Sequence, residues 1–244
     1  MPSALITGSN RGLGLALVRT ALADGWRVYA TARRPAEATD LRDLAGEDRL
    51  TILPMDLMDF ASIDRLAGHL DGAPIDVLLS NGAITGTKNT AFGETDYDDW
   101  ADLSRANAMA PMRLAEALVE NVAASQRKIM FFVSSWVGPN PNFGFVNYRA
   151  TKSALSQVAL QIALALKERC IVSSCGHPGW VATKAAAAGS GALTPDESAQ
   201  MLWRIIPNLT IADTGKFFDP DGSALPIVTQ QHDAKPYGMT RPVG

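Results

Sequence analysis

Short apolar runs alternate with longer stretches in which apolar residues recur at helical spacing. The runs Ile75 to Leu79 and Ile129 to Val133 are almost uninterrupted, as expected for strands that are buried on both faces of a sheet. Between Gly12 and Ala23 the apolar positions instead follow a helical period. This alternation predicts an α/β fold in three layers, with a doubly wound parallel sheet between two layers of helices.

The same pattern gives a full set of expected elements. Strands are predicted at 3–7, 26–31, 50–53, 75–79, 129–133, 171–174 and 216–218. Helices are predicted at 12–23, 36–45, 60–69, 97–122, 148–168 and about 194–206, and residues 223–244 are predicted to form an irregular tail. No repeat or linker interrupts the series, so residues 1–244 are expected to form a single domain.

Composition narrows the class of protein. The chain has 244 residues, 47% of them hydrophobic, and a net charge of −3 without a lysine or arginine cluster, which argues against a nucleic-acid partner. It has no basic leader and no apolar run of membrane-spanning length, so we expect a soluble cytoplasmic protein without a membrane partner. Cys170 and Cys175 are expected to be buried, reduced thiols, and no metal site is predicted.

The strongest candidate chemistry lies between residues 135 and 152. Tyr148 and Lys152 are four positions apart, so a helix would place both side chains on one face. An ammonium beside a phenol favours the phenolate, which predicts a lowered pKa for Tyr148 and a role in proton transfer near neutral pH. Ser135 follows a predicted buried strand, thirteen positions before Tyr148. We expect all three side chains to meet over one substrate oxygen.

Together with the glycine-rich stretch Thr7 to Gly14, the Ser-x12-Tyr-x3-Lys spacing resembles the short-chain dehydrogenase/reductase family over essentially the whole chain. The late segments His177 to Val181, Leu193 to Ser198 and Gly215 to Asp219 are most similar to the branch of the C-factor-like proteins and the insect carbonyl reductase sniffer. The resemblance implies a Rossmann fold and a catalytic set of Asn107, Ser135, Tyr148 and Lys152. Asn107 would lie in a kinked helix and hold a water linked to the lysine.

The glycine motif predicts a dinucleotide site. Gly8 and Gly12 allow a tight turn and close approach to a pyrophosphate, Gly14 lets the helix pack near the strand, and the helix N-terminus offers free N–H groups. With the residues that the resemblance adds, the expected cofactor-binding set is Gly8, Asn10, Arg11, Gly12, Leu13, Gly14, Arg33, Asp56, Leu57, Asn81, Gly82, Tyr148, Lys152, Pro178, Gly179, Val181 and Thr183.

The end of the second predicted strand indicates which cofactor is used. A carboxylate there would bind the ribose hydroxyl of NAD, but this chain has Arg33 and Arg34 instead. Arg33, helped by Arg11, can pair with the 2′-phosphate of NADP(H) through charge-assisted hydrogen bonds. NADP(H) is therefore expected rather than NAD(H). The alternative is that Arg34, and also Arg33, belong to a solvated loop.

The walls of a substrate pocket are less defined. Trp136, Phe143 and Trp180 are candidate lining residues, with packing within their own loop as the alternative, and the substrate loop is expected within 184–210. The chain departs from the family pattern in two places. Ser80-Asn81-Gly82-Ala83 replaces Asn-Asn-Ala-Gly, and Lys184 stands where an aspartate is usual.

These features predict an oxidoreductase that uses NADPH to reduce the carbonyl of a small, apolar aldehyde or ketone, with Tyr148 as the general acid. A homo-oligomer, dimer or tetramer, is also expected, from a helix after Tyr148 that is apolar on more than one side. Three alternatives remain: an alcohol or dihydrodiol dehydrogenase working with NAD, a C-factor-like signalling protein that binds nucleotide without turnover, and a partner subunit whose catalytic set is idle.

Overall fold

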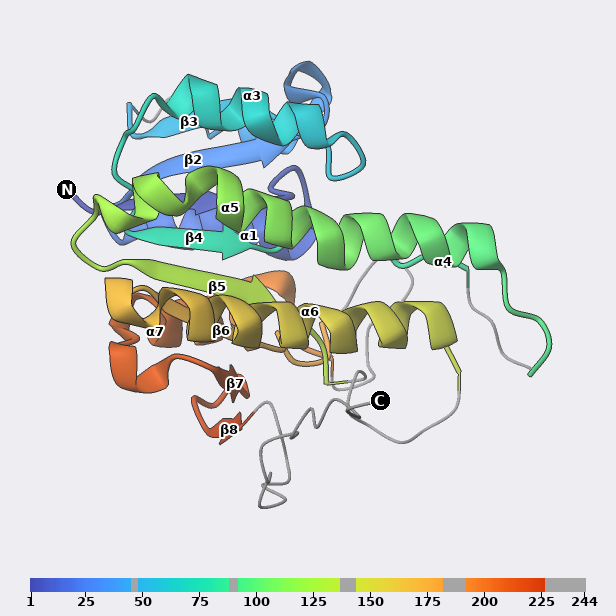
Figure 1. Cartoon of the computed structure of the whole chain (residues 1–244). Coiled ribbons are helices and arrows are strands. Elements are labelled where there is room, and N and C mark those ends of the chain that lie inside the picture. Colours follow the sequence, from blue (N-terminus) through green and yellow to red (C-terminus); the bar gives the residue numbers. More distant parts are fainter. Residues whose placement is uncertain (45–47, 88–91, 137–143, 182–191, 227–244) are drawn as a thin grey trace, which may run out of the picture.

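The computed structural model describes residues 1–44, 48–87, 92–136, 144–181 and 192–226 (Figure 1). Within these ranges one sheet has the strand order β3-β2-β1-β4-β5-β6-β7-β8. Its strands are β1 Ser3–Ile6, β2 Arg27–Ala32, β3 Leu50–Pro54, β4 Val77–Ser80, β5 Ile129–Val133, β6 Val172–Gly176, β7 Lys216–Phe218 and β8 Ala224–Pro226. The first seven are parallel, and β8 pairs antiparallel with β7.

Helices cover both faces of this sheet. Successive residues of β1 point to opposite sides, so that Ala4 and Ile6 belong to one apolar core and Leu5 to the other. The first core is closed by α1 Gly12–Ala23, α2 Thr39–Arg42 and α7 Pro195–Ile205, and the second by α3 Phe60–Leu70, α5 Ala110–Ala123 and α6 Val146–Leu166. Figure 1 shows α5 and α6 side by side across one face. The predicted doubly wound α/β fold is confirmed.

Short helical turns complete the described chain. They are η1 Pro35–Glu37, η3 Lys167–Arg169, η4 Ile206–Asn208 and η5 Ile211–Asp213. Before α7, the Thr194 hydroxyl accepts the N–H of Glu197 at 3.2 Å while the Glu197 carboxylate accepts the N–H of Thr194 at 2.8 Å. This capping box confirms the predicted helix start. None of the helices in the described ranges combines the length and the apolar character that a membrane span requires.

The expected helical region 97–122 is present as α4 Tyr97–Ser104, the π-helical turn η2 Arg105–Met109 and α5. Two other element predictions were wrong. The expected helix 36–45 is reduced to η1 and the four-residue α2, because Pro35 opens a 3₁₀ turn and Ala38 leaves helical geometry at ψ 66°. The expected irregular tail begins with β8, where a turn bonds the Asp219 N–H to the Ser223 carbonyl at 2.9 Å. The rest of that tail lies outside the described residues.

The prediction that both thiols are buried was half wrong. Cys175 lies on β6 with no exposed surface, whereas Cys170 ends η3 with φ 55° and is exposed. Cys170 lies in the short connection between η3 and β6, and such connections run over the protein surface. Burial raises the pKa of Cys175 to about 12, despite a hydrogen bond with Ser156 and the nearby charge of Lys152.

The two thiols should therefore react very differently. With a disulfide reagent at pH 8, the folded protein should show one reactive thiol per chain, because Cys175 is both inaccessible and protonated there. Unfolding in guanidinium should release a second. The variant Cys170→Ser is the control: it should show none when folded and one when unfolded. Two reactive thiols in the folded wild type would contradict the burial of the β6–α6 interface.

Candidate active site

The carboxyl ends of β1, β4, β5 and β6 lie at one edge of the sheet, on either side of the point where the strand order reverses. Ligands bind at such a switch point in open α/β sheets. The segment after β1 carries Gly8 at φ 66° and Gly12 at φ 55°, conformations that favour glycine. A Cβ at Gly14 would lie 2.1 Å from the Gly8 carbonyl oxygen, while one at Gly12 would meet nothing within 4 Å. The glycines thus form a tight turn with open space beside it.

The first turn of α1 faces this space. Asn10, Arg11 and Gly12 are exposed, and Leu13 packs partly against the core. The N–H groups in the first turn of a helix have no intrahelical partner and carry the positive end of the helix dipole. This turn and its open space have the features that a pyrophosphate site requires.

Thr7, which the sequence reading missed, joins the glycine turn to the end of β4. Its hydroxyl accepts the N–H of Asn81 at 3.0 Å and the N–H of Gly82 at 3.1 Å. The Asn81 side chain in turn donates to the Thr7 carbonyl at 3.0 Å and to that of Gly8 at 3.4 Å. Asn81 therefore fixes the glycine turn. These partners are more than seventy residues apart in sequence, which is why local patterns did not reveal Thr7.

The two arginines after β2 differ in their surroundings. Arg34 is paired with Glu37 at 3.3 Å across an exposed 3₁₀ turn. Arg33 is exposed, and among the described residues neither its guanidinium nor that of Arg11 has a hydrogen-bond or ion-pair partner. Arg33 is therefore the cation that is available to a phosphate, and Arg34 matches the alternative of a solvated loop residue.

The predicted catalytic side chains come together at the ends of β5 and α6. Ser135 follows β5, and its hydroxyl is hydrogen-bonded to the phenol of Tyr148 in the first turn of α6. The Lys152 ammonium lies 5.7 Å from the centroid of the Tyr148 ring. Lys152 is 3% exposed and donates to the carbonyl of Val133 at 2.9 Å. The i, i+4 pairing predicted for Tyr148 and Lys152 is thus present in the structure.

The predicted direction of the Tyr148 pKa was wrong. Burial raises the pKa of Tyr148, and the hydrogen bond with Ser135 offsets only part of that rise. Burial also lowers the pKa of Lys152 to about 8, with the nearby Cys175 opposing the change. The ammonium is bound to the Val133 carbonyl and lies near the tyrosine ring, so proximity along the helix did not acidify the phenol. Tyr148 is therefore protonated at neutral pH, as a proton donor must be.

Two buried serines, Ser134 and Ser156, hold the backbone of Lys152 in place. The Ser134 hydroxyl donates to the Lys152 carbonyl at 3.0 Å and lies 3.0 Å from the Ser156 hydroxyl, which also donates to that carbonyl at 3.2 Å. The Ser134 N–H donates to the Gly176 carbonyl on β6 at 2.8 Å. These bonds attach α6 to the ends of β5 and β6, so the lysine has little freedom to move.

Asn107 lies in the π-helical turn, 1% exposed, so the expected break in the helix is present. Its amide accepts the Ile84 N–H at 2.9 Å and donates to the Ile84 carbonyl at 2.8 Å and to the Thr151 hydroxyl at 3.2 Å. Asn107 thereby joins the segment after β4 to α6, and its partner on α6, Thr151, directly precedes Lys152.

A second network that the sequence reading missed holds the start of α6. The Asp99 carboxylate accepts from the Thr87 N–H and hydroxyl, each at 3.1 Å, and from the Asn147 amide at 3.0 Å. Asn147 is 1% exposed and also donates to the Asp96 carbonyl at 2.9 Å. Because Asn147 precedes Tyr148, this network fixes the helix turn that carries the phenol.

The remaining candidates are distributed around the same edge. Asp56 accepts the Met58 N–H at 2.9 Å in a local turn, and Leu57 would lie 3.1 Å from a Cβ at Gly82. Pro178, Gly179 and Val181 follow β6, and Val181 forms a bridge with Leu193. Thr183, Lys184 and Phe143 lie outside the described residues.

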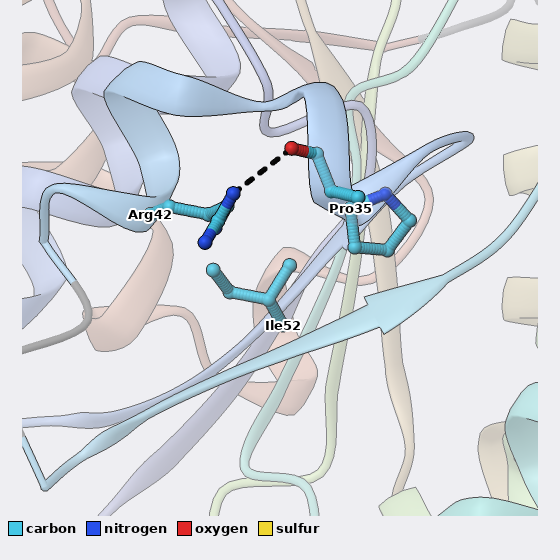
Figure 2. A pocket seen from close by; sticks show the side chains of 4 residues that line it. Pro35, Arg42 and Ile52 are labelled. Carbon is cyan, nitrogen blue, oxygen red and sulfur yellow. Dashed lines mark hydrogen bonds between the residues drawn. The ribbon is translucent and has the colours of Figure 1, made fainter.

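Two of the candidate pocket residues are exposed: Trp136 at 45% and Trp180 at 63%. Trp136 packs at 5.9 Å against the ring of His177. A separate open cavity of about 400 Å³ lies under α2, between Pro35, Ala36, Arg42 and Ile52 (Figure 2). There Arg42 donates to the Ala36 carbonyl at 3.0 Å. This cavity is not lined by any of the predicted catalytic residues.

Comparisons with known proteins agree with this geometry. Residues 2–191 match the family model described as short chain dehydrogenase. The structure is similar to the carbonyl reductase Sniffer of D. melanogaster, with 28% identity, a TM-score of 0.86 and coverage of 93% of this chain and 99% of that one. It is also similar to the NADPH-bound carbonyl reductase from chicken fatty liver, with 27% identity, a TM-score of 0.85 and coverage of 93% and 94%.

A relative of similar length is an uncharacterized oxidoreductase of Schizosaccharomyces pombe. It is 30% identical over 244 residues, which cover 91% of this chain and 96% of the relative. The match of the family model over most of the chain agrees with the strand order, the glycine turn and the Ser135, Tyr148 and Lys152 cluster. The chain belongs to the short-chain dehydrogenase/reductase family.

Proposed function

We propose that this protein is an NADPH-dependent oxidoreductase that reduces the carbonyl group of a small, apolar aldehyde or ketone. The observation that carries the proposal is the cluster of the buried Lys152 with the partly buried Ser135 and Tyr148 at the switch-point edge of the sheet. The NADPH-bound carbonyl reductase among the similar structures supports the choice of reaction and cofactor. NADPH, when bound, supplies the hydride that adds to the carbonyl carbon.

The residues around the edge fit this cofactor. The open space beside Gly12 and the first turn of α1 suit the pyrophosphate, and the unpaired Arg33 suits the 2′-phosphate, with Arg11 close in sequence to the same turn. Asp56 and Leu57 are proposed to border the adenine, and Asn81 and Gly82 the adenosine side of the site. Pro178, Gly179 and Val181, with Thr183 beyond the described residues, are proposed to hold the nicotinamide carboxamide.

In the proposed mechanism the chain's own residues control the proton. Tyr148, kept protonated by burial, donates its phenolic proton to the carbonyl oxygen, and Ser135 donates a hydrogen bond to the same oxygen. Lys152 balances the charge left on the phenol. The Lys152 ammonium has three N–H donors, and the Val133 carbonyl accepts from one of them. The other two are proposed to face the nicotinamide ribose and the Tyr148 phenol. Asn107 is proposed to anchor the water that returns a proton.

The substrate is proposed to be small and apolar because the exposed side chains beside Ser135 and Val181 are indoles, those of Trp136 and Trp180. Within the region 184–210, the residues before α7 are proposed to complete the substrate pocket. The later residues include α7, which packs in the core through Leu202 and Trp203. A homo-oligomer stays a prediction; the exposed Leu164 on α6 is compatible with it.

Removal of the proposed proton donor should abolish most of the turnover while leaving the affinity for NADPH nearly unchanged. The variant Tyr148→Phe should lose about a hundredfold or more in kcat, the low end for removal of a general acid, while NADPH affinity changes by less than about threefold. Steady-state kinetics and fluorescence titration measure the two quantities. Tyr97→Phe is the matched control, because Tyr97 is exposed and stacks on Trp100. Near-normal turnover in the Tyr148 variant would exclude this mechanism.

The two arginines after β2 allow a direct test of the cofactor. Arg33→Ala should raise the KM for NADPH by about tenfold to a hundredfold, the worth of charge-assisted hydrogen bonds, and leave the KM for NADH nearly unchanged. Arg34→Ala, which removes only an exposed pair with Glu37, should change neither KM by more than about twofold. If Arg33→Ala affected both cofactors equally, Arg33 would have no part in binding the 2′-phosphate.

The same assays separate the alternatives. An alcohol or dihydrodiol dehydrogenase would prefer NAD and the oxidative direction in side-by-side assays with both cofactors. A signalling protein or an idle partner subunit would bind NADPH but turn over nothing on a broad panel of aldehydes, ketones and quinones. The presence of Asn107, Ser135, Tyr148 and Lys152 together disfavours these last two, since neither needs a proton donor.

A further inference from the structure

His177 has no role in the reaction described so far, yet both nitrogens of its ring are engaged. His177 follows β6 directly, and its backbone N–H donates to the Phe218 carbonyl on β7 at 3.1 Å. In the ring, Nδ1 lies 3.1 Å from the backbone nitrogen of Gly179, and Nε2 lies 2.8 Å from the Asp219 carboxylate. The side chains of His177 and Asp219 are 17% and 29% exposed, so water competes only weakly for these bonds.

The two bonds determine where the ring proton lies. The Gly179 N–H can only donate, so Nδ1 must accept and carries no hydrogen. The proton is then on Nε2, where it donates to Asp219. With both nitrogens occupied, His177 has no free nitrogen for proton exchange with a substrate. Asp219 fixes the orientation and tautomer of the ring, and the ring fixes the Gly179 N–H.

The segment that this N–H belongs to, Pro178 to Val181, is held from two other sides. The Ser198 hydroxyl on α7 donates to the Pro178 carbonyl at 2.6 Å, and the Leu193 N–H donates to the Trp180 carbonyl at 2.8 Å. Gly179 itself has φ 80°, and a Cβ there would lie 2.7 Å from Leu193 Cδ1. The bond to His177 is thus the contact that supports the left-handed residue at the centre of the segment.

The two faces of the His177 imidazole pack against aromatic rings, one of which lies next to Ser135. The indole of Trp136 lies 5.9 Å from the imidazole, and the ring of Phe217 lies 6.0 Å from it in a stacked arrangement. Trp136 comes directly after Ser135, the proposed donor to the carbonyl oxygen. One side chain therefore touches both the 178–181 segment and the residue next to the catalytic serine.

We propose that His177, oriented by Asp219, is a positioning residue that sets the distance between the 178–181 segment and the Ser135 side of the site. This inference rests on the proposed function, in which the segment holds the nicotinamide and Ser135 the substrate oxygen. An imidazole is suited to the role because it accepts at one nitrogen, donates at the other and offers two flat faces. No amide side chain can do all of this from the same position.

Two substitutions separate the bonds of His177. In His177→Asn the amide oxygen can take the place of Nδ1 and accept from Gly179. In His177→Gln the amide reaches the place of Nε2 and keeps the donor to Asp219, while Gly179 loses its acceptor. Amide hydrogen exchange of Gly179, measured in the protein without NADPH, reports the first bond directly. His69→Gln, at an exposed position on α3, is the matched control.

The Asn variant should keep the exchange rate of Gly179 and the Kd for NADPH within about threefold of wild type, because it keeps the acceptor for Gly179. Its loss of the Asp219 bond and of the ring contact with Trp136 should instead raise the KM for the carbonyl substrate. The Gln variant should speed that exchange and weaken NADPH by about tenfold, the upper range for one hydrogen bond. Equal effects of the two variants, or a loss of thermal stability in both with unchanged NADPH binding, would overturn the inference. Failure of the proposed function is distinct: the wild type would then fail to bind NADPH or to reduce any carbonyl.

Discussion

The burial of the Lys152 ammonium is the constraint on which the site depends. A cation in the interior is stable only when its donors are satisfied and its neighbours are held in place. The Val133 carbonyl satisfies one donor, and Ser134 and Ser156 bind the lysine's own carbonyl, so Lys152 joins α6 to the end of β5. The Ser134 N–H extends this connection to the Gly176 carbonyl on β6. The same burial brings the pKa of Lys152 down to about 8, so the lysine stays mostly charged at neutral pH.

This arrangement bears on the direction of the proposed reaction. A tyrosine with a pKa raised by burial holds its proton, which suits reduction, where the phenol must give a proton to a carbonyl oxygen. Oxidation of an alcohol would instead require the phenolate to form first. In the proposed reaction, the Lys152 ammonium, 5.7 Å from the ring centroid, would stabilise the negative charge that forms on Tyr148 as its proton leaves.

The sequence predicted the parts of this molecule that depend on local periodicity. Seven of the strands, the two-sided sheet and the Tyr148–Lys152 pairing follow from spacing alone, because buried strands and helix faces repeat every few residues. The residues that it missed act across long separations. Thr7 binds residues of the segment after β4, Asp99 binds Asn147, and His177 binds Asp219. The π-helical turn depends in the same way on the bond between Asn107 and Ile84.

The departure from the family pattern after β4 has a physical account. Gly82 stands where the family places alanine, and a Cβ at Gly8 would lie 2.6 Å from the Gly82 Cα, so the backbones of the two segments nearly touch. A side chain at Gly82 would in turn lie 3.1 Å from Leu57, a distance that requires the leucine to shift. The Thr7 hydroxyl holds this contact by accepting both N–H groups of Asn81 and Gly82. The Ser80 hydroxyl, in contrast, is buried without a hydrogen-bond partner among the described residues, so it takes no part in this contact.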